Sequence, residues 1–127
     1  MAGFEQETLD AIGRQREVRF TTRGRRTGKP RSVTIWVSSD GRRVFIRSGG
    51  GMTRDWPQNL IKSGNGTLHV GGTDLPVRAR HLTDPAEARW VSELVIRKYG
   101  PTVKRSLEGG PPTPAEQATF ELVPHSE

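Results

Sequence analysis

Residues 21–31 read Thr-Thr-Arg-Gly-Arg-Arg-Thr-Gly-Lys-Pro-Arg and join two segments with the alternating pattern of β-strands. This connection holds five cations and no acidic residue. Because like charges held this close repel one another, the loop is unfavourable unless an anion lies among them. Gly24 and Gly28 permit tight turns and a close approach to a ligand, and Pro30 fixes the start of the next strand. The stretch therefore predicts either a cradle for phosphate or carboxylate, or a solvated basic hairpin loop.

Alternating apolar residues on both sides of this loop predict a small antiparallel barrel, closed or split, with helices packed outside it. In the segment 32–38, Val33, Ile35 and Val37 share the core face, so Trp36 points the other way and needs a different cover. Asp40-Gly41 is typical of a hairpin turn. We expect six strands, at residues 17–22, 32–38, 43–48, 67–70, 75–81 and 119–123.

Capping signals predict two helices. Asp55 is placed to cap a short helix that has Pro57 in its first turn and ends at Gly64. Asp84, Pro85 and a capping-box glutamate at position 87 predict the start of a longer helix that ends near Tyr99.

The remaining segments are irregular by sequence. Residues 1–15 are flexible or form a short helix, residues 102–108 add a helical turn, and residues 109–114 are a linker before the last strand. The length of 127 residues predicts a single domain that covers 1–127.

The composition restricts the function. Only 31% of the residues are hydrophobic, which suits a small barrel, and the absence of cysteine excludes disulfides and thiolate sites. The net charge of +6 and the pI of about 10.7 predict an anionic partner. No stretch resembles a signal peptide or a bilayer span, so we expect a cytoplasmic protein without membrane association. The histidines have no metal-ligand spacing, so we expect no metal site.

Two motifs resemble a known family. The string Thr22-x-Gly-Arg-Arg-Thr-Gly-x-Pro-Arg31 and the string Trp56-x-x-Asn-Leu60 are similar to the deazaflavin-dependent nitroreductase family, within the flavin-binding split-barrel group of pyridoxamine-phosphate-oxidase-like proteins. The resemblance covers roughly residues 18–82 and is nearest to a branch of short proteins without assigned function. It implies a fold that is mainly β with two or more helices, a six-stranded antiparallel split β-barrel. It also implies a bound deazaflavin of the F420 type or FMN, and a homodimer.

The same resemblance implies which residues meet the cofactor. Arg25 and Arg26 would contact its phosphate, and bidentate guanidinium groups suit such oxygens. Nitro-reducing members often carry a lysine after the third strand, where this chain has glycines with Arg47 and Arg54 nearby. The full expected set of cofactor-binding residues is Arg25, Arg26, Thr27, Lys29, Arg31, Trp36, Ser48, Gly49, Gly50, Trp56 and Asn59.

These expectations give three hypotheses for the function. The first is an oxidoreductase that passes hydride from the cofactor to an electron-poor small molecule, with Tyr99 and Ser48 as the proton-donor candidates. The second is a non-catalytic split-barrel module that binds a flavin-type cofactor or another anion. The third, nucleic-acid binding, is disfavoured because the aromatic residues are few and are not interleaved with the basic runs. Two alternatives stay open at this point: Trp36 packs under a helix or at a dimer interface, and Arg47, Arg78 and Arg80 form a solvated strand face.

Overall fold

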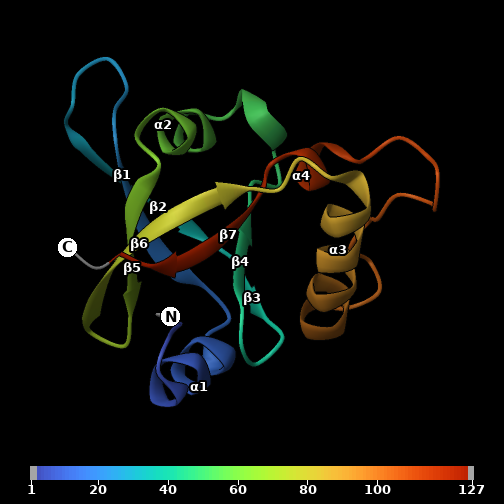
Figure 1. Cartoon of the computed structure of the whole chain (residues 1–127), viewed down its shortest axis with the longest axis horizontal. Helices are drawn as coiled ribbons and strands as arrows, with labels where there is room; N and C mark the ends of the chain where they lie inside the picture. Colours follow the sequence, from blue (N-terminus) through green and yellow to red (C-terminus); the bar gives the residue numbers. More distant parts are fainter. Residues whose placement is uncertain (1–2, 126–127) are drawn as a thin grey trace.

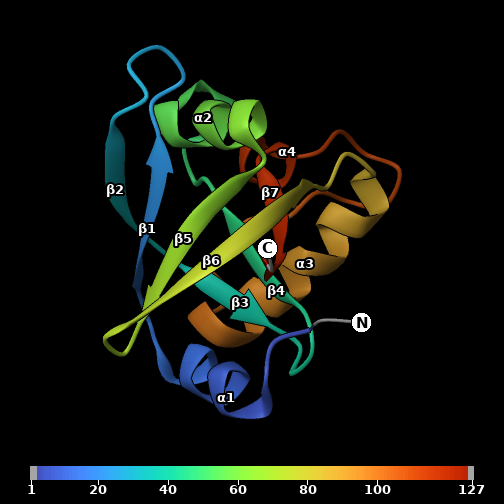
Figure 2. The same ribbon diagram turned by 60° about the vertical axis from the view of Figure 1, so that its left-hand side comes forward.

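A computed structural model describes residues 3–125, so residues 1–2 and 126–127 of the predicted domain lie outside the described part. The described residues form one seven-stranded antiparallel sheet in the order β2-β1-β5-β6-β7-β4-β3, curled into a half-barrel (Figures 1 and 2). Its strands are β1 (Val18–Arg23), β2 (Pro30–Ile35), β3 (Val37–Ser39), β4 (Val44–Arg47), β5 (Asn65–Val70), β6 (Thr73–His81) and β7 (Thr119–Pro124).

The strand count differs from the predicted six because segment 32–38 is divided at Trp36. β2 pairs with β1 at one edge of the sheet, whereas β3 pairs with β4 at the other edge. The pairing of β1 with β2 ends where Val18 faces Ile35. Beyond it, the backbone N–H of Val37 donates to the Tyr99 hydroxyl at 3.2 Å, and its carbonyl accepts from Lys98 Nζ at 2.8 Å. Side chains of a helix thus replace a strand partner, and the chain crosses from one edge of the sheet to the other.

The helices surround this sheet. α1 (Gln6–Arg14) and α2 (Asp55–Ser63) lie at opposite ends of it, and α3 (Pro85–Tyr99) runs along its side (Figure 1). Of the two options expected for residues 1–15, flexible chain or a short helix, the structure has the helix, as α1. A 3₁₀ turn, η1 (Gly51–Thr53), leads into α2. Among residues 3–125, no helix has the length and apolar character needed to cross a bilayer.

Two predicted caps are corrected. Asp55 is the first helical residue of α2, and Arg54 occupies the N-cap position. Asp84 does cap α3, because its carboxylate accepts from the N–H of Ala86 at 3.0 Å. Glu87, however, forms no capping box; its carboxylate binds the guanidinium groups of Arg43 and Arg80, which attract it more strongly than a backbone amide would.

The predicted linker at 109–114 is shorter than expected, because a fourth helix, α4 (Pro114–Gln117), begins inside it. Thr113 and Glu116 form a capping box: Thr113 Oγ1 accepts from the N–H of Glu116 at 3.1 Å, and Glu116 accepts from the N–H of Thr113 at 2.9 Å. The helical turn predicted at 102–108 is absent; that segment has turns, a bend and residues without regular secondary structure.

Two apolar clusters hold the layers together. The barrel interior is filled from every strand of the sheet and is closed by residues of α1 and α2, including Ile12 and Trp56. A second cluster packs α3 on the outside of the sheet around Phe45, which is 1% exposed. Phe45 points outward from the barrel as predicted, and α3 buries it.

Candidate functional site

The basic loop is a compact turn. The N–H of Gly24 donates to the carbonyl of Lys29, and the N–H of Gly28 donates to the carbonyl of Gly24, each at 2.8 Å. Gly28 has a φ of +71°, and a Cβ on Gly24 would lie 2.7 Å from Thr27 Oγ1, so both positions favour glycine. These two backbone hydrogen bonds close the loop, and the side chain of Arg23 adds a third contact by donating to the carbonyl of Gly28 at 3.1 Å.

The two motifs meet in space at Arg25 and Asn59. The buried Asn59 side chain on α2 accepts hydrogen bonds from the backbone N–H and from Nη1 of Arg25, and Asp55 lies 3.5 Å from the same Nη1. In Figures 1 and 2 the loop that joins β1 and β2 lies beside α2. The second motif thus positions the first, a relation that the sequence spacing does not reveal.

A small basic cavity lies between this loop and α2. It has a volume of about 200 Å³. Among residues 3–125, the Arg26 and Arg31 side chains at this cavity have no ion-pair or hydrogen-bond partner, whereas Lys29 does not line it. Its lining consists of Gly24, Arg25, Arg26, Thr27, Arg31, Asp55 and Asn59.

A larger cavity of about 880 Å³ adjoins the small one, since Asp55 lines both. Residues of β2, β4, α2, α3 and segment 102–104 form its wall. Five of the expected cofactor residues line it: Trp36, Ser48, Gly49, Gly50 and Trp56. Of the eleven expected residues, five thus line the larger cavity, five others line the smaller one (Arg25, Arg26, Thr27, Arg31 and Asn59), and Lys29 lines neither.

The glycine run forms an open segment of the cavity wall. A Cβ on Gly49 would meet nothing within 4 Å, whereas one on Gly50 would lie 2.3 Å from Arg54 Nε, so Gly50 leaves room for that arginine. The N–H of Ser48 is already donated to the carbonyl of Ala118 at 3.0 Å. Any amide contacts with a ligand in this segment therefore fall to Gly49 and Gly50.

Arg47 is a residue whose place the sequence did not reveal. The interpretation of it as part of a solvated strand face is wrong, because its guanidinium lies between β4 and α3 and lines the larger cavity. It donates to Thr119 Oγ1 at 3.0 Å, to Ser92 Oγ at 2.9 Å and to the carbonyl of Ala88 at 3.0 Å. Burial lowers its pKa to about 10, although the charge of Glu116 opposes that shift.

A buried hydrogen-bond network continues behind Arg47. Ser92 donates to Glu116 at 2.7 Å, and the N–H groups of Ser106 and Thr113 donate to the same carboxylate. Burial alone would raise the pKa of Glu116, but these hydrogen bonds outweigh it and lower the pKa to about 2. The network ties α4 and segment 102–113 to α3 at the back of the cavity.

Trp36 and Tyr99 form one unit at the rim of the larger cavity. Their rings stack with centroids 3.9 Å apart, and Trp36 remains 41% exposed. The Tyr99 hydroxyl contacts the carbonyls of Arg16 and Val37 at 2.7 and 3.1 Å, and Tyr99 itself does not line the cavity. Burial raises the pKa of Tyr99. Tyr99 at the end of α3 thus packs against the Trp36 ring, and the rest of that side chain stays exposed.

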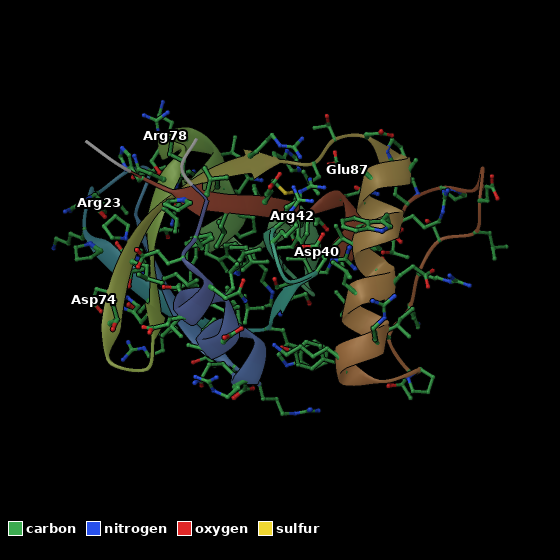
Figure 3. The ribbon with its side chains drawn as sticks, turned by 60° about the horizontal axis from the view of Figure 1, so that its bottom comes forward. Arg23, Asp40, Arg42, Asp74, Arg78 and Glu87 are labelled. Carbon is green, nitrogen blue, oxygen red and sulfur yellow. The ribbon has the colours of Figure 1, made fainter. Side chains whose placement is uncertain are left out.

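Two other polar clusters lie outside the cavities. Arg43 and Arg80 bind Glu87 and Glu121 and clamp α3 to the sheet. In the other cluster, His69 connects Thr21 Oγ1 to Asp74, with both distances at 2.7 Å. Figure 3 shows Asp74 at the β5–β6 hairpin, across the molecule from Glu87.

Within the described residues, no group of three or more His, Cys, Asp or Glu side chains is placed to hold a metal.

Residues 8–122 match a family described as an uncharacterized protein conserved in bacteria, DUF2255. The chain belongs to this family. Among curated proteins, none matches the sequence. The DUF2255 match agrees with the expected branch of short proteins without assigned function.

Solved structures share the fold of this DUF2255 chain. A candidate 5-nitroimidazole antibiotic resistance protein from Bacteroides thetaiotaomicron VPI-5482 has a TM-score of 0.69 at 12% identity, covering 100% of this chain and 83% of that one. An F420-H2 dependent reductase (FDR-A) has a TM-score of 0.59 at 23% identity, with coverage of 86% and 94%. A domain-swapped dimer has a TM-score of 0.59 at 22% identity, with 92% of each chain covered. The resemblance to the deazaflavin-dependent nitroreductase group is thereby confirmed at the level of the fold.

Proposed function

We propose that this chain is an oxidoreductase that binds a deazaflavin cofactor of the F420 type. It would catalyse hydride transfer from that cofactor to an electron-poor small molecule. The observation that carries the proposal is the pair of adjoining cavities, one small and basic, the other large and partly apolar. A volume of about 880 Å³ falls within the range of roughly 300–1,000 Å³ that is typical of ligand pockets. Support for the choice of cofactor comes from the F420-H2 dependent reductase among the structures of similar fold.

The residues present fit such a cofactor. Arg26 and Arg31 offer charges without a protein partner to a phosphate or an anionic tail, and Asn59 holds Arg25 beside them. Trp36, Trp56 and the glycines 49–50 line the space for a flat ring system. When bound, a deazaflavin or flavin supplies the hydride chemistry itself. The protein itself would bind the cofactor, orient the two reactants and exclude water.

A non-catalytic binding module is the second candidate, and the placement of Tyr99 favours it. The Tyr99 hydroxyl is engaged with backbone carbonyls, so Ser48 is the remaining proton-donor candidate at the cavity wall. Ser48 is 3% exposed and is not paired with a base in the described residues. In this alternative the same cavities would store or shield the cofactor.

Titration of the purified protein with F420 and with FMN, followed by cofactor fluorescence, tests the proposal. We expect micromolar binding of F420, which weakens with added salt because the contacts are ionic. Turnover of quinones, enones and nitro compounds with reduced F420 separates the enzyme from the binding module. Binding of neither cofactor would overturn the oxidoreductase and the storage of a flavin-type cofactor, and it would leave only a module that binds another anion. The homodimer and the cytoplasmic location stay predictions; size-exclusion chromatography with light scattering tests the first.

A further inference from the structure

Arg47 is a half-buried cation at a wall of the larger cavity. Among the described residues no carboxylate lies within ion-pair distance of it, and its three hydrogen-bond acceptors are two hydroxyls and one carbonyl. Within residues 3–125, Ser92 connects Arg47 to Glu116 by hydrogen bonds. Because Glu116 acts on Arg47 across Ser92 and not by direct contact, the cost of burying this charge is offset only in part, so a ligand oxyanion at this position would be strongly stabilised.

The donor capacity of Arg47 is not exhausted by the protein. A guanidinium has five N–H groups, and the contacts to Thr119, Ser92 and Ala88 use three of them. One N–H remains on each of the two terminal nitrogens. Two such donors match the two oxygens of a carboxylate.

The residues around Arg47 indicate what kind of ligand would bear this carboxylate. Phe45, Val91, Val95 and Val103 line this side of the cavity, and Lys104 adds a second cation. The acids of the cavity wall, Glu17 and Asp55, come from the segment before β1 and from α2 instead. A flat or aliphatic body with one carboxylate therefore suits this side.

We infer that Arg47 and the surrounding α3 side of the larger cavity form a subsite for the carboxylate of the electron-poor acceptor. This inference rests on the proposed function, in which the basic loop at the other end holds the anionic part of the cofactor. The two arginine sets then have separate tasks: Arg26 and Arg31 bind the cofactor, and Arg47 selects acceptors that bear an acid group.

Benzoate and its neutral analogue benzamide test the subsite in cofactor-free protein by calorimetry. We expect benzamide to bind at least about tenfold more weakly, since a charged hydrogen-bond pair is lost. Arg47→Met should weaken benzoate binding by a similar factor. Arg42→Met, in the β3–β4 turn outside the cavity (Figure 3), should leave it unchanged. Equal binding of the two probes, or unchanged benzoate binding by Arg47→Met, would overturn the inference.

A second measurement needs only the wild-type chain, because Arg47→Met removes three internal hydrogen bonds and endangers folding. The Nε–H of Arg47 donates to Thr119, so its NMR signal is expected to be slow to exchange. Benzoate should shift this signal, and an unshifted signal at saturating benzoate would overturn the subsite.

If neither cofactor binds while benzoate does, the proposed function fails and the anion site stands. If a cofactor binds while benzoate does not, the subsite fails and the proposed function stands.

Discussion

Asn59 Oδ1 accepts two hydrogen bonds from Arg25, one from its backbone N–H at 3.0 Å and one from Nη1 at 2.9 Å. One buried amide group on α2 thereby fixes both the path of the basic loop and the direction of its first cavity-lining guanidinium. The loop is positioned by a helix 34 residues farther along the chain, so its order depends on tertiary contact.

Asn59→Ala should therefore affect stability and cofactor binding together. We expect the free energy of unfolding to fall by about 1–2 kcal/mol, because a backbone donor loses its partner. Cofactor affinity should also fall, since Arg25 is no longer held. Urea denaturation and cofactor titration measure the two effects. Lys62→Ala, on the exposed side of the same helix, is the matched control. Wild-type values for both measurements in Asn59→Ala would show that the contact has no such role.

The basic loop offers a comparison between two exposed cations, Arg26 and Lys29. Arg26 lines the small cavity and Lys29 does not. We expect Arg26→Ala to weaken cofactor binding about tenfold, because one charge-assisted contact is lost, and to leave the melting temperature nearly unchanged. Lys29→Ala should weaken binding by less than about twofold at physiological salt. Equal losses in the two variants would mean that the loop attracts the cofactor only by its total charge.

Local patterns predicted much of the fold, and contacts between distant segments account for what they did not. The alternation in β1, the Asp40-Gly41 turn and the cap of α3 are local signals, and each was predicted correctly. The division of segment 32–38 into two strands at Trp36 was not predicted, because it depends on Tyr99 and Lys98 from α3. Arg47 looked like a solvated residue because its sequence neighbours alternate, and only the packing of α3 over β4 buries it.

In the candidate site, too, local motifs predicted some residues, and contacts between distant segments supplied the others. The two motifs predicted residues that do line two adjoining cavities, with Lys29 as the exception. The wall contributed by α3 and by segment 102–104 carries no motif, so no sequence signal pointed to it. The capping box of Thr113 and Glu116 was visible as a pattern, but the prolines around it favoured a linker.

Glu116 should make stability depend on pH in the acid range. Its pKa is about 2 in the folded chain, against 4.5 ordinarily, so the folded state favours the charged form. This contribution is complete above about pH 4.5 and disappears as the pH falls from 4.5 to 2. We expect Glu116→Gln to lower the free energy of unfolding at pH 7 on the order of 3 kcal/mol, with a smaller difference from wild type at pH 3. Urea denaturation at both pH values measures this.

Glu108→Gln, an exposed acid in the neighbouring loop, is the control for that experiment and should follow the wild-type curve. A difference between Glu116→Gln and wild type that stays constant from pH 7 to pH 3 would contradict the assigned cause. In that case the loss would arise from packing, since packing does not change with protonation.

Tyr99→Phe separates the structural contribution of Tyr99 from a catalytic one. The ring and its stacking on Trp36 are kept, while the hydroxyl contacts to Arg16 and Val37 are lost. We expect the free energy of unfolding to fall by about 1 kcal/mol, because the chain crossing after Trp36 loses its side-chain partner. Turnover with reduced cofactor should change by less than about threefold, since a proton donor in general acid catalysis contributes roughly a hundredfold or more.

Trp36→Ala, which removes a wall residue of the cavity, should instead weaken cofactor or acceptor binding. A hundredfold loss of turnover in Tyr99→Phe at unchanged cofactor affinity would make Tyr99 the proton donor after all, and it would require the hydroxyl to leave its backbone partners during the reaction.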